Sequence, residues 1–353
     1  MVDYTEILTN VDVDAMLITD PYNLRYYTGF RGGEGVSLIS KSSKVLITDS
    51  RYTEAAEKEC YDGFKVRQFG NGISTISIIK EYISSDGINF LGFEDMSISY
   101  SDYQKFSGGL GCEMKPIKDA LLIPRQIKSP EEIELLREAE HIGDMAFDDI
   151  LSILKPGMTE LEVAAEIEYS MKRHGAEGLS FDTIAASGVN SSMPHAIPST
   201  KKLENGDFLT MDFGCIYKGY CSDMTRTVCI GKASDEQKEI YNIVLSAQLA
   251  VLDNLKPGMM CKDVDRIARD YINAQGYGDY FGHGLGHGVG LYIHESPAFN
   301  TRDTSIVKPG MVETDEPGIY LPGKFGVRIE DMILITENGC EPLARSPKEL
   351  IEL

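Results

Sequence analysis

Short apolar runs alternate with polar turns in the first part of the chain. Strand-like runs occur at residues 15–20, 35–49 and 88–94, and a helical spacing occurs at residues 73–83. The second run breaks at Ser42-Ser43, as a hairpin does. The pattern therefore predicts an α/β domain from Ala15 to about Pro116. Within it, the segment from Asn23 to Gly32, NLRYYTGFRG, is interpreted as an edge loop that packs its tyrosines on the domain.

The rest of the chain opens with helices whose start signals are explicit. Ser129 to Glu132 forms a capping box with a proline at the first helical position, and Thr159 to Glu162 forms another. The pentapeptide LKPGM occurs at Leu154 to Met158 and again at Leu255 to Met259, each time between two helical patterns. These features predict two copies of a helix, helix, strand, strand unit. The expected domain limits are 1–124 and 129–353.

Two aspartates lie in the arms of a hairpin predicted for residues 208–228, FLTMDFGCIYKGYCSDMTRTV. A two-residue loop at Tyr217-Lys218 would place Asp212 directly opposite Asp223. A loop one residue later would make the two aspartates diagonal neighbours on the same face. Like charges so placed repel unless a cation lies between them, so the hairpin holds either a metal ion or two solvated aspartates. This stretch alone favours neither.

The second copy contributes histidines from a glycine-rich segment, Phe281 to Glu295, FGHGLGHGVGLYIHE. Its alternating glycines make a helix improbable and predict an extended backbone that a substrate or ion can approach closely. His283 and His287 then share a face, and His294 lies further along.

A second hairpin is predicted for residues 314–330, TDEPGIYLPGKFGVRIE. A three-residue loop, Pro322 to Lys324, would place Glu316 opposite Glu330. Four such carboxylates buried without cations would repel one another strongly, so the two hairpins together favour a metal centre.

Composition narrows the class of protein. Apolar residues make up 42% of the 353 residues and the formal net charge is −21. Such a charge argues against nucleic acid or an anionic membrane as a partner. The N-terminus lacks the features of a signal peptide, no apolar run has membrane-spanning length, and seven scattered cysteines indicate no disulfide framework. A soluble, cytoplasmic protein is expected.

Five residues of the hairpins and the glycine-rich segment suit two divalent cations: Asp212, Asp223, His287, Glu316 and Glu330. Oxygen ligands with one imidazole fit Mn²⁺, which we expect, or Co²⁺, Zn²⁺ or Fe²⁺. Paired ions can activate a water and polarise the bond that it attacks, which points to hydrolysis of an amide or a phosphate. The chain contains no phosphate-binding P-loop, no GxSxG elbow and no dinucleotide fingerprint.

The motifs MDFG, CSDMTRT, HGLGHGVGLYIHE, TDEPGIY and GVRIED closely resemble those of the pita-bread metallopeptidases, in the branch of aminopeptidase P and prolidase. The resemblance covers the whole chain and implies an α/β (α+β) protein, with an N-terminal creatinase-like α/β domain followed by a duplicated pita-bread catalytic domain. It implies that Asp212 binds one ion, that His287 and Glu316 bind the other, and that Asp223 and Glu330 bridge them.

The resemblance also implies roles around the metals. The residues concerned are His195, His283 and His294 on the substrate side, Glu316 as general base, and Arg328 beside the ligands, where we expect it to bind Glu330. It further suggests a homodimer and peptide substrates with proline at the second position. Asp315 departs from the family pattern, which has an uncharged residue there, and should point away from Glu316.

Four functions remain distinguishable. An Xaa-Pro aminopeptidase comes first, because a dipeptidase needs a cation for the substrate carboxylate, and Ala298 follows the HESP motif where proline dipeptidases often carry an arginine. An Xaa-Pro dipeptidase is the close alternative. A non-catalytic peptide-binding relative is more remote, because no ligand is missing. A methionine aminopeptidase is disfavoured because that group lacks the N-terminal domain.

Overall fold

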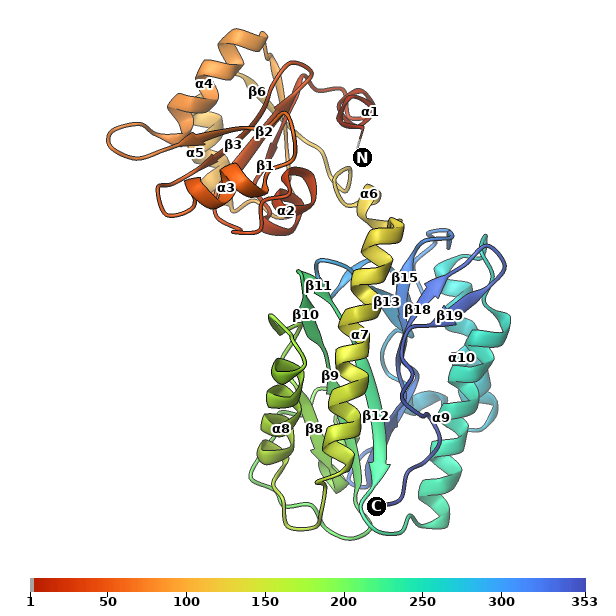
Figure 1. The fold of residues 1–353 in the computed structure, drawn as a ribbon. Coiled ribbons are helices and arrows are strands. Elements are labelled where there is room, and N and C mark those ends of the chain that lie inside the picture. The colour runs from red at the N-terminus through yellow and green to blue at the C-terminus, as the bar shows by residue number, and fades with distance from the viewer. Residues whose placement is uncertain (1–2) are drawn as a thin grey trace. The chain divides into compact units, whose positions relative to one another are not determined.

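The computed structural model describes residues 3–353, and the chain divides between Arg125 and Gln126 into two compact units (Figure 1). The domain limits expected from the sequence, 1–124 and 129–353, stay a prediction. Among residues 3–353, no helix is long and apolar enough to cross a membrane.

The first unit is a six-stranded sheet, of order β4-β3-β2-β1-β5-β6, with helices on both faces. Its strands are β1 (Ala15–Ile18), β2 (Val36–Ser40), β3 (Lys44–Thr48), β4 (Lys65–Gln68), β5 (Phe90–Phe93) and β6 (Glu113–Pro116). Its helices are α1 (Tyr4–Asn10), α2 (Pro21–Thr28), α3 (Thr53–Glu59), α4 (Thr75–Asp86), α5 (Tyr100–Leu110) and α6 (Ile123–Gln126), the last of which runs across the division. Only β2 runs against the other strands.

Successive apolar side chains of the strands point to opposite faces of the sheet and form two apolar layers in this unit. Leu17 of β1 belongs to a cluster with Ile79 of α4 and Phe106 of α5. Its neighbour Met16 belongs to the other cluster, with Leu24 of α2. Because successive side chains of a strand point to opposite faces, one short strand supports both layers. The predicted strands, hairpin and helix of this part are confirmed.

The prediction of a loop from Asn23 to Gly32 is wrong for the first half of this segment, which belongs to helix α2. Asp20 caps this helix by accepting hydrogen bonds from the backbone N–H groups of Tyr22 and Asn23. Pro21 occupies the first helical position and Gly29, at φ 83°, ends the helix. These are ordinary start and stop signals, which the mixture of aromatic and basic residues obscured.

The second unit contains two helix pairs and their strands (Figure 1). The first copy contains α7 (Pro130–Leu151), α8 (Glu160–Arg173), β7 (Gly178–Leu179), β8 (Ile184–Ser187), η1 (Gly188–Ser192), β9 (Phe208–Phe213), β10 (Cys215–Tyr217), β11 (Tyr220–Cys221) and β12 (Met224–Cys229). The second contains α9 (Asp235–Asn254), α10 (Cys261–Ala274), η2 (Gly278–Tyr280), β13 (Gly286–Gly288), β14 (Glu295–Phe299), β15 (Val312–Asp315), β16 (Gly318–Leu321), β17 (Phe325–Arg328), β18 (Asp331–Ile335) and β19 (Cys340–Pro342). The expected order of two helices before strands is thus present twice.

The two LKPGM segments make equivalent hydrogen bonds. Gly157 N–H donates to Leu203 O at 2.9 Å, and Gly258 N–H donates to Val307 O at the same 2.9 Å. Both glycines have φ 93°, a left-handed conformation that side chains rarely adopt. Each segment therefore ends a helix and binds, before the next helix, to the backbone of a segment about fifty residues further along that lies outside the strands, which supports the predicted duplication.

Candidate metal centre

The first hairpin holds two aspartates on one face. In the ladder of β9 with β12, Asp212 lies opposite Thr225, which makes Asp223 its diagonal neighbour. The turn residues are Lys218 and Gly219, at φ 45° and φ 85°, both in the left-handed region that a two-residue hairpin turn requires. The first of the two predicted loops, Tyr217-Lys218, is therefore wrong, and the second, one residue later, is confirmed.

The second hairpin has the predicted three-residue loop, Pro322 to Lys324, between Leu321 and Phe325. The pairings on both sides of the glutamates keep one register: Gly318 lies opposite Arg328, and Asp315 lies opposite Asp331. Glu316 and Glu330 occupy the gap between these two ladders. The shared register makes them face each other, as the sequence predicts.

The glycine-rich segment brings an imidazole to the two acid pairs. His287 Nε2 lies 3.6 Å from Asp223 Oδ2 and 3.6 Å from Glu316 Oε1. Its neighbour Gly286 has no room for a side chain, since a Cβ there would lie 1.9 Å from the backbone oxygen of Thr314. Glycine is thus required for β13 to lie close enough to β15.

Ligand atoms of Asp223, His287 and Glu330 all lie within 4.8 Å of one another, so each could bind the same ion. Burial, together with the charge of Glu330, raises the pKa of Asp223 well above its ordinary value. Burial raises the pKa of Glu316 to about 8, and burial with the charge of Glu316 raises that of Glu330. The cluster is therefore costly to charge without cations.

Two further observations fit bound cations. Burial lowers the pKa of His287 to about 4, so its imidazole is neutral and has a lone pair for a metal. Asp212 Oδ1 is buried and has no hydrogen-bond partner among the described residues. A buried carboxylate oxygen without a donor is the arrangement that a divalent ion would satisfy.

Arg328 binds Asp212, not Glu330 as predicted. Its Nη2 lies 2.6 Å from Asp212 Oδ2, and its Nε donates to Thr225 Oγ1 at 3.0 Å. The Thr225 hydroxyl in turn donates to Glu330 Oε2 at 2.6 Å. Thr225 therefore links the arginine to the glutamate, a contact that the sequence did not reveal because it joins strands more than a hundred residues apart.

Tyr320 is a further neighbour that sequence reasoning missed. Its hydroxyl accepts from Arg328 Nη1 at 2.8 Å and lies 2.9 Å from His283 Nε2. His283 Nδ1 lies 2.7 Å from the backbone oxygen of Gly284, to which it can only donate, so Nε2 accepts from the tyrosine. The predicted substrate-side His283 is thus joined through Tyr320 to Arg328 and then to Asp212.

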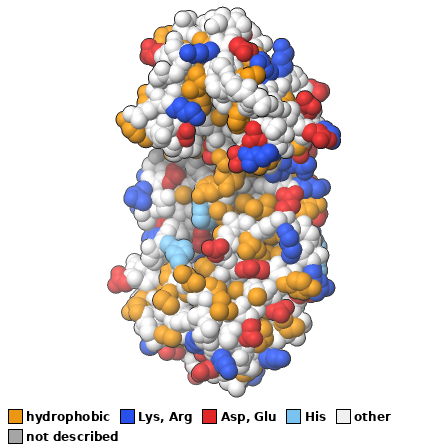
Figure 2. Space-filling model, turned by 90° about the vertical axis from the view of Figure 1, so that its left-hand side faces the viewer, with side chains coloured by type: hydrophobic (Ala, Val, Ile, Leu, Met, Phe, Trp, Pro, Cys, Tyr) orange, Lys and Arg blue, Asp and Glu red, His pale blue; other side chains and the backbone are white. Residues whose placement is uncertain are grey.

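The other two predicted histidines are exposed. The rings of His294 and His287 meet edge to face, 4.5 Å apart. Partial burial of its ring, and to a smaller extent the charge of His195, lowers the pKa of His294. Figure 2 shows histidine side chains beside acidic atoms on one face of the molecule. Both side chains can therefore reach a molecule bound in front of the cluster.

A second group of charges lies behind the ligand strands. Arg226, 1% exposed, donates to the backbone oxygen of Glu330 at 2.5 Å and to Asp331 Oδ1 at 2.7 Å. Lys348 also binds Asp331. Asp315 is fully buried beside Asp331, and burial with the charge of Asp331 raises its pKa. As expected for the residue before Glu316, Asp315 is not part of the metal cluster.

The raised carboxylate pKa values predict how the metal-free protein responds to pH. The pKa of Glu316 rises from 4.5 to about 8, so the folded state binds more protons than the unfolded state between these values. Its contribution to stability is full below the lower pKa and is lost as the pH rises through the higher one. We expect the free energy of unfolding, measured by denaturant titration with a chelator present, to fall by up to about 1.4 kcal/mol per pH unit for each such proton.

Two comparisons isolate the cluster in this experiment. Saturating Mn²⁺ should abolish the fall, because a divalent ion favours the charged carboxylates. Glu316→Gln should flatten the metal-free profile, whereas Glu57→Gln, at an exposed position on α3, should leave it as in the wild type. Identical profiles for wild type and Glu316→Gln would show that Glu316 does not contribute to the effect.

Comparison with known proteins extends over both units. Residues 134–337 match the model of metallopeptidase family M24, and residues 4–127 match the creatinase/prolidase N-terminal domain. The Xaa-Pro dipeptidase of Pyrococcus furiosus is 41% identical over 96% of this chain and 95% of its own length.

Two solved structures are similar throughout. The Xaa-Pro dipeptidase from Bacillus anthracis has a TM-score of 0.95 at 45% identity and covers 99% of this chain and 98% of its own. The X-Pro aminopeptidase from Thermotoga maritima has a TM-score of 0.92 at 40% identity, with 99% and 100% covered. The predicted fold class and family are confirmed: with its creatinase-like first domain and the catalytic domain that follows, the chain belongs to metallopeptidase family M24.

Proposed function

We propose that this metal-dependent exopeptidase is an Xaa-Pro dipeptidase. The observation that carries the proposal is the gathering of the five predicted ligand residues on two hairpins and one glycine-rich strand, in a chain similar along its whole length to proteins named Xaa-Pro dipeptidase. The similarity favours the dipeptidase over the aminopeptidase that the sequence placed first.

The residues that would hold two divalent ions are Asp212, Asp223, His287, Glu316 and Glu330. When bound, such ions polarise the scissile carbonyl and lower the pKa of a water. We propose Mn²⁺ as the physiological metal, with Co²⁺, Zn²⁺ and Fe²⁺ as alternatives.

Glu316 is the proposed general base, which would accept a proton from the attacking water on its carboxylate. Bound cations favour the charged form of this carboxylate, which is the form that can take up a proton. Thr314 Oγ1 donates to Glu316 Oε1 at 3.2 Å and helps to orient the group. A base that is already held in the reactive orientation lowers the entropic cost of reaching the transition state.

The histidines would act on the substrate side. The exposed imidazoles of His195 and His294 can donate hydrogen bonds to the carbonyl whose oxygen becomes negative in the transition state. His283 would act through Tyr320, by holding the hydroxyl to which Arg328 also donates. Arg328 in turn would keep Asp212 in position.

An Xaa-Pro aminopeptidase is the second candidate, favoured by one feature of this chain. Ala298 follows the HESP motif, and Arg328, the arginine of the site, is already paired with Asp212. A substrate that continues beyond proline needs no cation for its carboxylate. The homodimer and the cytoplasmic location stay predictions.

Removal of a bridging ligand should abolish turnover. Asp223→Ala or Glu330→Ala is expected to lower kcat at saturating Mn²⁺ by more than about 100-fold, because even a lost neighbour of a ligand costs about 10–100-fold. Asp148→Ala, at an exposed position on α7, is the control and should retain wild-type kcat. Retention of more than about a tenth of kcat in either ligand variant would contradict the two-metal assignment.

The metal content of the variants should distinguish the three histidines from the metal ligands. His195→Ala, His283→Ala and His294→Ala are each expected to keep both ions, measured by elemental analysis, yet to lower kcat by roughly 100-fold. His174→Ala, which removes a pair with Asp149, should change neither. Loss of ions from one of the three variants would make that histidine a ligand, and full activity would remove its role.

Substrate length decides between the two candidate functions. For a dipeptidase, kcat/KM for an Xaa-Pro dipeptide should exceed that for the matching Xaa-Pro-Yaa tripeptide by about tenfold or more, or about 1.4 kcal/mol of transition-state preference. Both substrates are to be measured with one enzyme preparation and one metal. A preference of the same size for the tripeptide would establish the aminopeptidase instead.

A further inference from the structure

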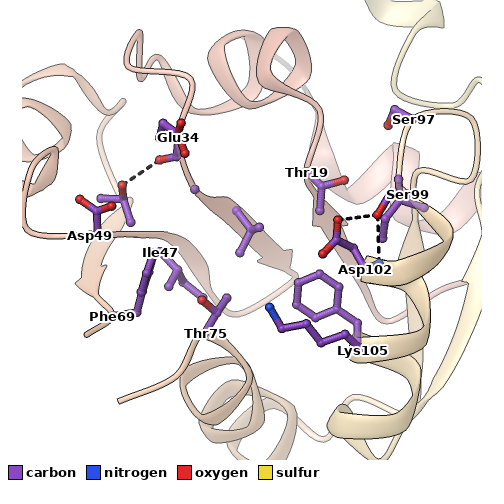
Figure 3. A pocket seen from close by; sticks show the side chains of 15 residues that line it. Thr19, Glu34, Ile47, Asp49, Phe69, Thr75, Ser97, Ser99, Asp102 and Lys105 are labelled. Atoms are coloured by element: carbon purple, nitrogen blue, oxygen red, sulfur yellow. Dashed lines mark hydrogen bonds between the residues drawn. The ribbon is translucent and has the colours of Figure 1, made fainter. Parts of the chain in front are cut away.

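The first unit has a cavity of about 310 Å³ at the edge of its sheet (Figure 3). The cavity lies at the carboxyl ends of β1, β3 and β4, which run in one direction. The residues that directly follow these strands, Thr19, Asp49 and Phe69, line it. Ligands of open α/β sheets bind at the carboxyl ends of strands, where the chain connections diverge to the two sides. The connections diverge in this way between β1 and β5, because the chain continues from β1 to β2 on one side and from β5 to β6 on the other.

Several polar groups of this cavity are occupied by contacts within the protein. Thr19 Oγ1 donates to Glu94 Oε2 at 3.1 Å, and Thr48 Oγ1 donates to a backbone oxygen at 2.7 Å. Arg51 binds the Asp49 carboxylate at 2.6 Å, and Ser99 donates to Asp102 Oδ2 at 2.6 Å. The hydroxyls are thus committed and Asp49 is paired with a cation, whereas the Asp102 carboxylate accepts from a neutral hydroxyl and forms no ion pair within residues 3–353.

Two charged side chains of opposite sign lie on different sides of the cavity. Within residues 3–353, Lys105 of α5 forms no ion pair, and Figure 3 shows its ammonium end directed into the cavity toward Thr75. The Glu34 carboxylate likewise forms no ion pair in that part of the chain and lies on the other side of the cavity in the figure. Val36, Ile47 and Phe106 add apolar surface to the wall.

We propose that this cavity binds a small zwitterion with an apolar side chain, either a free amino acid or a short peptide. The ligand's carboxylate would face Lys105, its ammonium would face Glu34, and its side chain would pack on the apolar wall. A simple anion would be repelled by Glu34 and Asp102, and a simple cation would leave Lys105 without a partner, whereas a zwitterion can pair with both Glu34 and Lys105. The volume is at the small end of ligand sites, which fits a molecule of this size.

The experiment observes the cavity directly in the metal-loaded, full-length protein. Isoleucine methyl groups are isotope-labelled, and the signals of Ile47 and Ile98, which line the cavity, are assigned with Ile47→Val and Ile98→Val. Leucine and glycyl-leucine are then titrated in separate arms at millimolar concentration. We expect a saturable shift of both signals with at least one of the two, and the arm that binds more tightly identifies the source of the ligand.

Variants and analogues test the recognition. Lys105→Met and Glu34→Gln should each weaken binding by about tenfold or more, as loss of a charged hydrogen-bond partner does. Lys80→Met and Glu57→Gln, at exposed positions outside the cavity, should not change it. Isocaproate and isopentylamine, which each keep one charge of leucine, should bind about tenfold more weakly than leucine.

Three results would overturn the proposal. They are no saturable shift at Ile47 and Ile98, binding that survives both Lys105→Met and Glu34→Gln, or isocaproate or isopentylamine binding as tightly as leucine. The proposal does not rest on the peptidase function, because the signals come from the first unit. Lys105→Met should therefore keep wild-type kcat/KM, whichever substrate the enzyme prefers.

Discussion

Electrostatic repulsion among buried carboxylates is the constraint around which the second unit is built. Asp223 and Glu330 are almost fully buried, and the charge of Glu316 opposes the ionisation of both. The chain holds them together because each belongs to a hairpin whose register is set by its turn. A one-residue slip in either ladder would turn the carboxylates to the opposite face. The turns therefore decide whether a metal centre exists at all.

Charges on the reverse face complete this arrangement. Glu330 and Asp331 are consecutive, so their side chains point to opposite faces, one toward the metal cluster and one toward Arg226. Arg226 also binds the backbone oxygen of Glu330 and that of Ser346, near the C-terminus. The last residues of the chain are thus connected to a ligand strand by the same guanidinium. This contact explains why so large a charged side chain is buried in the catalytic unit.

The sequence was sufficient to predict features that depend on residues close together along the chain. Turn residues fixed the register of Glu316 with Glu330, and capping boxes at Ser129 and Thr159 fixed helix starts. The choice between two loops at Lys218 needed the positive φ angles that only coordinates supply. Arg328 was assigned the wrong partner because a long side chain can reach several acids, and only packing selects among them.

The ion pairs behind the ligand strands have a consequence for the enzyme at high temperature. The hydration of charged groups becomes less favourable as temperature rises, so the penalty for burying Arg226 with Asp331 and Lys348 decreases on heating. The stabilisation from apolar contacts, such as those that cover both faces of the first unit's sheet, gains no such advantage. The burial of the charges that anchor the strand of Glu330 is therefore less costly in the hot protein than in the cold one.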